Sequence, residues 1–180
     1  MTKPTLLYTM LDRVLVCAAG HVDLADDEWS TMVGAMDASG RSSMDALIVT
    51  DANGPNASQR ALLLALPFAK RLRVACVTRS GLVRGMVTAL AWACMPIRAF
   101  SPDDVDDAAT WLDLAGAEKL DAFRQLATLR ARLAGAASLD AAEAALGVTG
   151  IAAAHALFQT SIADLERKLR GRPMAASNRT

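Results

Sequence analysis

Polar side chains that could bind a ligand follow two apolar runs in the first half of the 180-residue sequence. The run 46–50 (ALIVT) is followed by Asp51, and the run 72–78 (LRVACVT) is followed by Arg79. When such runs form parallel strands, their carboxyl ends meet at one edge of the sheet, where the helices that follow present free backbone N–H groups. We therefore predict a rim at this edge that binds a ligand or a partner. Its predicted members are Asp51, Asn53, Gly54, Asn56, Ser58, Arg60, Arg79, Ser80 and Arg84.

The charged and hydroxyl groups of this rim allow two interpretations each. Arg60, Arg79 and Arg84 could hold an anion, but the simpler interpretation is that they are solvated helix residues paired with nearby acids. Ser58 lies early in an expected helix, where an added phosphate would interact favourably with the helix dipole. The simpler interpretation of Ser58 is an ordinary residue of the first turn.

Catalytic chemistry has little support in the sequence. The two histidines, His21 and His155, lie far apart and lack the carboxylate or cysteine spacing of a metal site. Ser80 precedes a glycine at a suitable strand-to-helix turn, but the GxSxG elbow is missing, as are the GxxxxGK[ST] and GxGxxG phosphate-binding motifs. We predict no catalytic residue, no metal and no cofactor. An enzyme that uses the rim around Asp51 and Ser80 is the alternative.

Composition argues against nucleic acid and membrane as partners. The 19 basic and 19 acidic side chains cancel, so no overall field attracts an anionic polymer. Residues 139–149 resemble the first helix and turn of a helix-turn-helix, but the next segment, 150–158 (GIAAAHALF), is mostly alanine, which cannot read bases by hydrogen bonding. No uninterrupted apolar run approaches the roughly 18 residues of a membrane helix.

The N-terminus also lacks the apolar core of a signal peptide, and the three cysteines show no CxxC spacing. We expect these cysteines to be buried and reduced. A cytoplasmic protein without a membrane span is therefore predicted.

The apolar pattern predicts an α/β fold in the first part of the chain. A β-hairpin is expected at 5–10 and 14–19, and each later apolar run is separated from the next by a helical segment. Right-handed crossovers between such runs give a mixed, mostly parallel five-stranded sheet flanked by helices. The helical segments are expected at 23–36, 55–70, 82–94 and 101–114, and the later strands at 46–50, 72–78 and 96–100.

Beyond this α/β domain, 1–115, the pattern is wholly helical. We predict a helical extension of about three helices over 116–170, the last of them at 151–169, and a flexible tail at 171–180. Apolar residues recur every three or four positions, and this stripe must be buried against something. It either folds over the chain's own sheet or serves self-association or partner docking. The predicted stripe is Leu120, Phe123, Leu126, Leu129, Leu133, Leu157, Phe158, Ile162, Leu165 and Leu169.

The stretch 46–114 resembles the STAS/SEC14-like (SpoIIAA-like) domains of the bacterial anti-sigma-factor-antagonist superfamily. The resemblance rests on the order of the predicted strands and on short motifs, and it covers roughly the first 114 residues. It implies a module that docks proteins, sometimes under phosphorylation control, or that binds a hydrophobic ligand or a nucleotide. The motifs are Pro55 with Gln59 and Arg60, Val83-Arg84-Gly85, Trp92, Phe100-Ser101-Pro102, and Trp111-Leu112.

The sequence departs from that family at one functional position. In the antagonist branch the phosphorylated serine lies in an Asp-Ser-Ser-Gly turn, whereas the corresponding turn here is Asp51-Ala52-Asn53-Gly54. Both serines are absent, so the resemblance does not extend to regulation by that phosphoserine.

Two functions follow as hypotheses. The first is a non-enzymatic regulatory or protein-docking module whose tail helices serve self-association or bind a protein partner. The second is a binder of a small apolar ligand or lipid in a pocket between sheet and helices, because adaptable methionines suit apolar pockets. Candidate lining residues for that pocket are Met32, Met36, Met86 and Met95.

Overall fold

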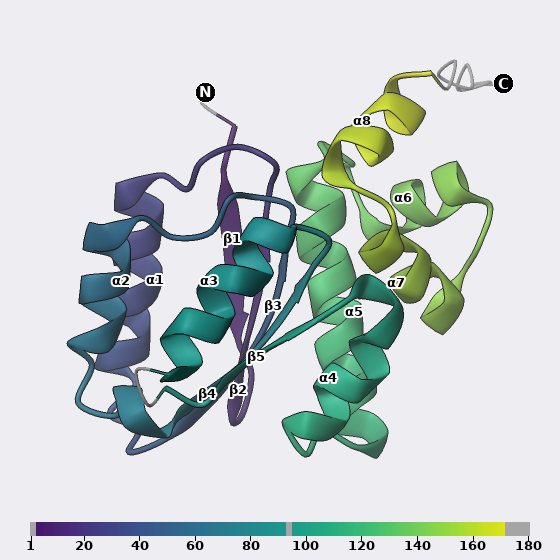
Figure 1. The fold of residues 1–180 in the computed structure, drawn as a ribbon. Helices are drawn as coiled ribbons and strands as arrows, with labels where there is room; N and C mark the ends of the chain where they lie inside the picture. The colour runs from purple at the N-terminus through teal and green to yellow at the C-terminus, as the bar shows by residue number, and fades with distance from the viewer. Residues whose placement is uncertain (1–2, 93–94, 172–180) are drawn as a thin grey trace, which may run out of the picture.

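The predicted strands form one five-stranded sheet in the computed structural model, which describes residues 3–92 and 95–171. The strands lie in chain order, with β1 antiparallel to β2 and every later pair parallel. The predicted mixed, mostly parallel sheet flanked by helices is therefore confirmed (Figure 1). The predicted helix end at Cys94 and the predicted tail beyond Gly171 lie outside the described residues. The strands are β1 (Leu6–Met10), β2 (Val14–Ala19), β3 (Met44–Thr50), β4 (Leu72–Thr78) and β5 (Ile97–Phe100).

Three helices connect the parallel strands and cover one face of the sheet. They are α1 (Asp26–Ala38), α2 (Ala57–Leu64) and α3 (Gly81–Trp92). Because the strands follow one another in a single direction across the sheet, right-handed crossovers place all three helices on the same side, as Figure 1 shows. The opposite face must be covered by the rest of the chain.

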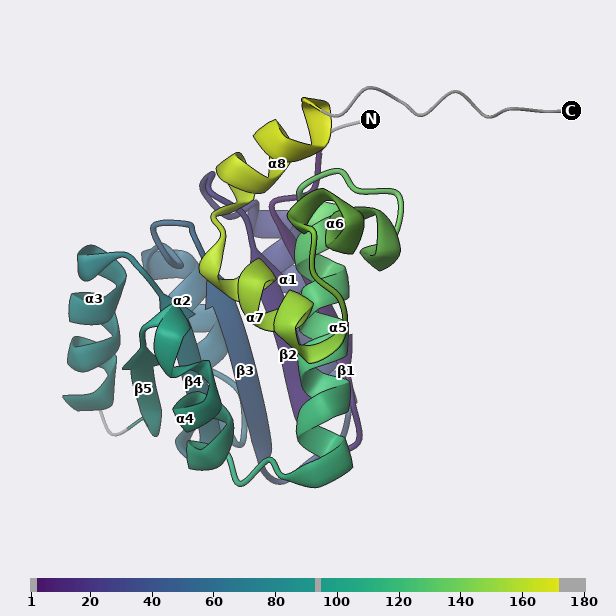
Figure 2. The ribbon, with the colours of Figure 1, turned by 90° about the vertical axis from the view of Figure 1, so that its right-hand side faces the viewer.

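The chain after β5 supplies that cover. A short turn of 3-10 helix (Pro102–Asp104) leads into α4 (Val105–Trp111), and α5 (Gly116–Leu133) then runs along β1 and β2. Figure 2 shows α5 lying over these strands, with α7 beside it. The remaining helices are α6 (Leu139–Leu146), α7 (Gly150–Gln159) and α8 (Ile162–Arg170).

Two of the predicted helices are shortened or divided in the structure for reasons that the sequence explains. The helix predicted over 55–70 ends at Leu64, before Pro67, because a proline disfavours helical conformation in the residue that precedes it. The single helix predicted over 151–169 is divided into α7 and α8. Thr160 is extended and the hydroxyl of Ser161 accepts a hydrogen bond from the backbone of Asp164, so a new helix begins there. The extension thus contains four helices in place of about three.

The predicted apolar stripe covers the chain's own sheet. Its residues Phe123, Leu126, Leu129, Leu133, Leu157, Phe158, Ile162 and Leu165 are buried. They share one core cluster with sheet residues such as Val16, Leu47 and Val77, so this core spans both sides of residue 115. Leu169 packs at the margin of the cluster, and Leu120 is 55% exposed. The stripe is therefore used within the chain, apart from Leu120.

Candidate apolar ligand site

Asp51, the first predicted rim residue, holds helices in place at the carboxyl end of β3. Its Oδ2 accepts hydrogen bonds from the backbone N–H of Ile162 at 2.8 Å and from Nη2 of Arg130 at 3.2 Å. Arg130 is completely buried, and it also donates to the carbonyl oxygens of Leu157 at 2.8 Å and Thr160 at 2.6 Å. Asp51 is thus occupied by a contact that fastens the α7–α8 junction to the sheet.

Burial and the neighbouring carboxylate have opposite effects on the pKa of Arg130. Desolvation lowers the pKa of the Arg130 guanidinium, while the charge of Asp51 and its hydrogen bond act in the opposite direction. The sequence analysis missed Arg130, although a signal exists: it lies four residues after Leu126 and three before Leu133, on the apolar side of its helix.

Four of the other eight rim residues form helix caps or contacts with nearby side chains. The side-chain oxygen of Asn56 accepts from the backbone of Gln59 at 3.0 Å, and the hydroxyl of Ser58 donates to the same oxygen at 2.7 Å. Ser80 accepts from the backbone of Val83 at 3.3 Å at the start of α3. Asn53 donates to Asp23 at 3.3 Å.

The remaining rim residues divide between the surface and a pocket. Arg79 and Arg84 are exposed, on the loop before α3 and on α3 itself. Gly54 and Arg60 line a pocket on the face that carries α1, α2 and α3. The nine predicted rim residues therefore do not form a single cluster, and two of them, Gly54 and Arg60, line the pocket.

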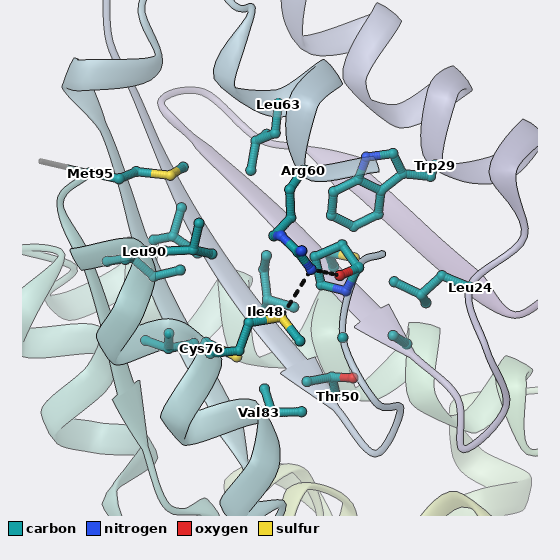
Figure 3. A pocket seen from close by; sticks show the side chains of 18 of the residues that line it. Leu24, Trp29, Ile48, Thr50, Arg60, Leu63, Cys76, Val83, Leu90 and Met95 are labelled. Atoms are coloured by element: carbon teal, nitrogen blue, oxygen red, sulfur yellow. Dashed lines mark hydrogen bonds between the residues drawn. The ribbon is translucent and has the colours of Figure 1, made fainter. Parts of the chain in front are cut away.

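The pocket lies over the middle of the sheet, between α2 and α3 (Figure 3). Cys17, Ile48 and Cys76 are paired neighbours on β2, β3 and β4 and form its floor. The cavity measures about 70 Å³. Its walls include Trp29 from α1, Arg60, Leu63 and Leu64 from α2, Val83, Met86 and Leu90 from α3, and Met95.

The pocket arises from how the two helices pack. The eight-residue α2 packs mainly on α1, whereas α3 packs mainly on β5, so neither fills the space above β3 and β4. Ile48 is consequently only half-buried although its strand is the central one of the sheet. On the solvent side, Leu64 lines the pocket and is 46% exposed. The pocket therefore opens to solvent beside α2.

Two of the four predicted methionines line this pocket. Met86 and Met95 do so, whereas Met32 and Met36 lie on α1 and are buried in the core between that helix and the sheet. The side chain of Met86 also limits the space beside Gly54. A Cβ at that glycine would lie 3.3 Å from the Met86 sulfur, and its φ of +85° favours glycine in any case.

The two thiols on the pocket floor are uncharged. Burial raises the pKa of Cys17 and raises that of Cys76 to about 12. One strand separates the two cysteines, so their Cα atoms are about 10 Å apart, too far for a disulfide without backbone movement. Arg60 is thus the one charged group among the described residues that line the pocket.

Residues 3–92 and 95–171 contain no cluster of three histidine, cysteine or acidic side chains close enough to hold a metal ion. His21 is exposed in a turn, and His155 lies on α7 with its ring against that of Phe123, on the far side of the sheet from the pocket. Among the described helices none is by itself long and apolar enough to cross a membrane, although α6 and α7 together, bent by 78°, reach the required length and composition.

Comparison with known proteins found no matching family model, no similar curated protein and no similar solved structure. The resemblance to STAS/SEC14-like domains therefore stays a prediction.

Proposed function

We propose that this protein is a non-enzymatic binding module that holds a small apolar molecule between its sheet and helices α2 and α3. The observation that carries the proposal is the half-buried Ile48 on the central strand, at the floor of an apolar pocket. Protein interiors are ordinarily packed as densely as organic crystals. An accessible apolar side chain in the middle of a sheet is therefore the kind of place where a small ligand binds.

The size and lining of the pocket limit what it can hold. A buried water needs roughly 10–15 Å³ and several polar partners, whereas an engineered apolar cavity of about 150 Å³ binds benzene. The pocket here lies between those sizes at about 70 Å³. Apart from Thr50 and Arg60, the side chains that line it are aliphatic, aromatic or sulfur-containing, so water would find few partners. A longer molecule would fit if the flexible side chain of Met86 moved, or if the molecule extended past Leu64 into solvent.

Ile48→Phe is expected to weaken the binding of a neutral apolar probe, 1-octanol, at least tenfold. The larger ring fills the floor of the pocket, where the probe would otherwise lie. Calorimetric titration of the purified protein with 1-octanol measures the effect, and native mass spectrometry shows whether an apolar ligand co-purifies.

Leu82→Phe is the matched control for this experiment. Leu82 lies on α3 and is 67% exposed, outside the pocket, so the same larger ring there should leave octanol binding unchanged. Far-UV circular dichroism verifies that both variants are folded, since overpacking a core costs about 1–3 kcal/mol. Unaltered binding by a folded Ile48→Phe variant would rule out the pocket as the site.

A protein-docking module, with the regulatory role expected from the sequence, is the second candidate function. It is favoured by Leu82 and Trp92, which are 67% and 84% exposed on α3. Tryptophan is enriched among the residues that contribute most to protein interfaces. This candidate predicts that the mass of the full chain in light scattering rises with concentration and that Trp92→Ser abolishes the rise. A cytoplasmic location belongs to both proposals.

A further inference from the structure

We infer that Arg60 makes the pocket selective for a small amphiphile with one carboxylate, such as a medium-chain alkyl carboxylate. This inference rests on the proposed function, because it names the class of ligand that the same pocket takes. The alkyl chain would lie against the apolar walls, and the carboxylate would meet the guanidinium.

The position of Arg60 supports this assignment. Its side chain extends from α2 into the pocket beside Trp29, as Figure 3 shows. Nη1 donates to the carbonyl oxygen of Pro55 at 2.6 Å and contacts the Met86 sulfur at 3.7 Å. These contacts fix one edge of the guanidinium. Nε and Nη2 have no hydrogen-bond partner within residues 3–92 and 95–171.

The charge of Arg60 is not balanced nearby. No salt bridge in the described part of the chain involves Arg60, so the interpretation of a surface arginine paired with an acid does not apply to it. The ionisable groups on the pocket floor, Cys17 and Cys76, are neutral thiols. The pocket therefore carries one positive charge among uncharged groups, and an anion that entered it would supply the ion-pair partner that Arg60 lacks.

The number and kind of donors favour a carboxylate over a phosphate. A guanidinium presents parallel N–H groups that match the two oxygens of a carboxylate. A phosphate monoester carries nearly two negative charges at neutral pH and three acceptor oxygens. No lysine or second arginine lines the pocket among the described residues, so a second charge would be unpaired.

The test compares two probes with the same alkyl chain, octanoate and 1-octanol, by calorimetric titration of the full chain at neutral pH. We expect octanoate to bind at least tenfold more tightly than octanol. In Arg60→Met, which keeps an unbranched apolar side chain, octanol binding should persist and the preference for octanoate should disappear. Arg84→Met removes an exposed arginine of α3 that lies outside the pocket, and it should leave both affinities unchanged.

The outcomes separate this inference from the proposed function. Equal affinities for the two probes in the unmodified protein, or an undiminished preference in a folded Arg60→Met variant, would overturn the role of Arg60 and leave the apolar pocket standing. If neither probe binds, the proposed function is overturned, and the inference with it.

Discussion

A chain that ends at Ala115 is expected to be unfolded or aggregated. The truncation removes α5 to α8, including the helix that covers β1 and β2, and with them eight large, buried apolar side chains. Burial of each contributes roughly 1.5–3 kcal/mol. Their combined loss, on the order of 10 kcal/mol, is comparable with the whole net stability of a domain, about 5–15 kcal/mol. The eight residues are Phe123, Leu126, Leu129, Leu133, Leu157, Phe158, Ile162 and Leu165.

Circular dichroism and light scattering measure this effect. The matched control is a chain that ends at Gly171, which retains every helix from α5 to α8 and is expected to fold like the full chain. A folded monomer formed by residues 1–115 would contradict the prediction. It would also mean that the helical extension has some purpose other than covering the sheet.

Replacing Arg130 by alanine is expected to lower the free energy of unfolding by about 3–5 kcal/mol, the usual cost of breaking a buried ion pair on one side. The substitution would leave the carboxylate of Asp51 without its cation. It would also leave the carbonyl oxygens of Leu157 and Thr160 without their donor. Denaturation in urea, followed by circular dichroism, gives the change.

Two further variants isolate the cause. Arg132→Ala removes an exposed arginine from the same helix, so its effect should stay within about 0.5 kcal/mol. Combining Arg130→Met with Asp51→Asn removes both charges and should cost less than the sum of the two single changes, because neither charge is then buried alone. A loss below 1 kcal/mol for Arg130→Ala would contradict the structural role assigned to this pair.

The fold was largely predictable because it depends on local patterns. The apolar runs 46–50 and 72–78 are short, rich in branched residues and separated by helical segments, and these features define a parallel sheet. The surface against which the apolar stripe packs could not be predicted in the same way. Periodicity shows that one face of a helix is buried, but it does not identify the surface that buries it.

The candidate site was less predictable than the fold. Asp51, Asn56 and Ser80 have the side chains expected of a binding rim, but these same side chains also cap helices or pair with a distant arginine. Arg60 was among the predicted residues, but the gap between α2 and α3 into which it points depends on how two helices pack. Met32 and Met86 were likewise both predicted to line a pocket, but only the fold shows that Met86 lines it whereas Met32 is buried in the core.

The cover of the sheet by its last helices has a consequence during synthesis. The strands are complete at Phe100, whereas the buried residues of α5 to α8 continue to Leu165. Residues 101–165 take roughly 3–13 seconds to translate at about 5–20 residues per second. During that interval the nascent chain exposes the apolar side of its strands on the ribosome, where a chaperone that binds apolar segments would find it.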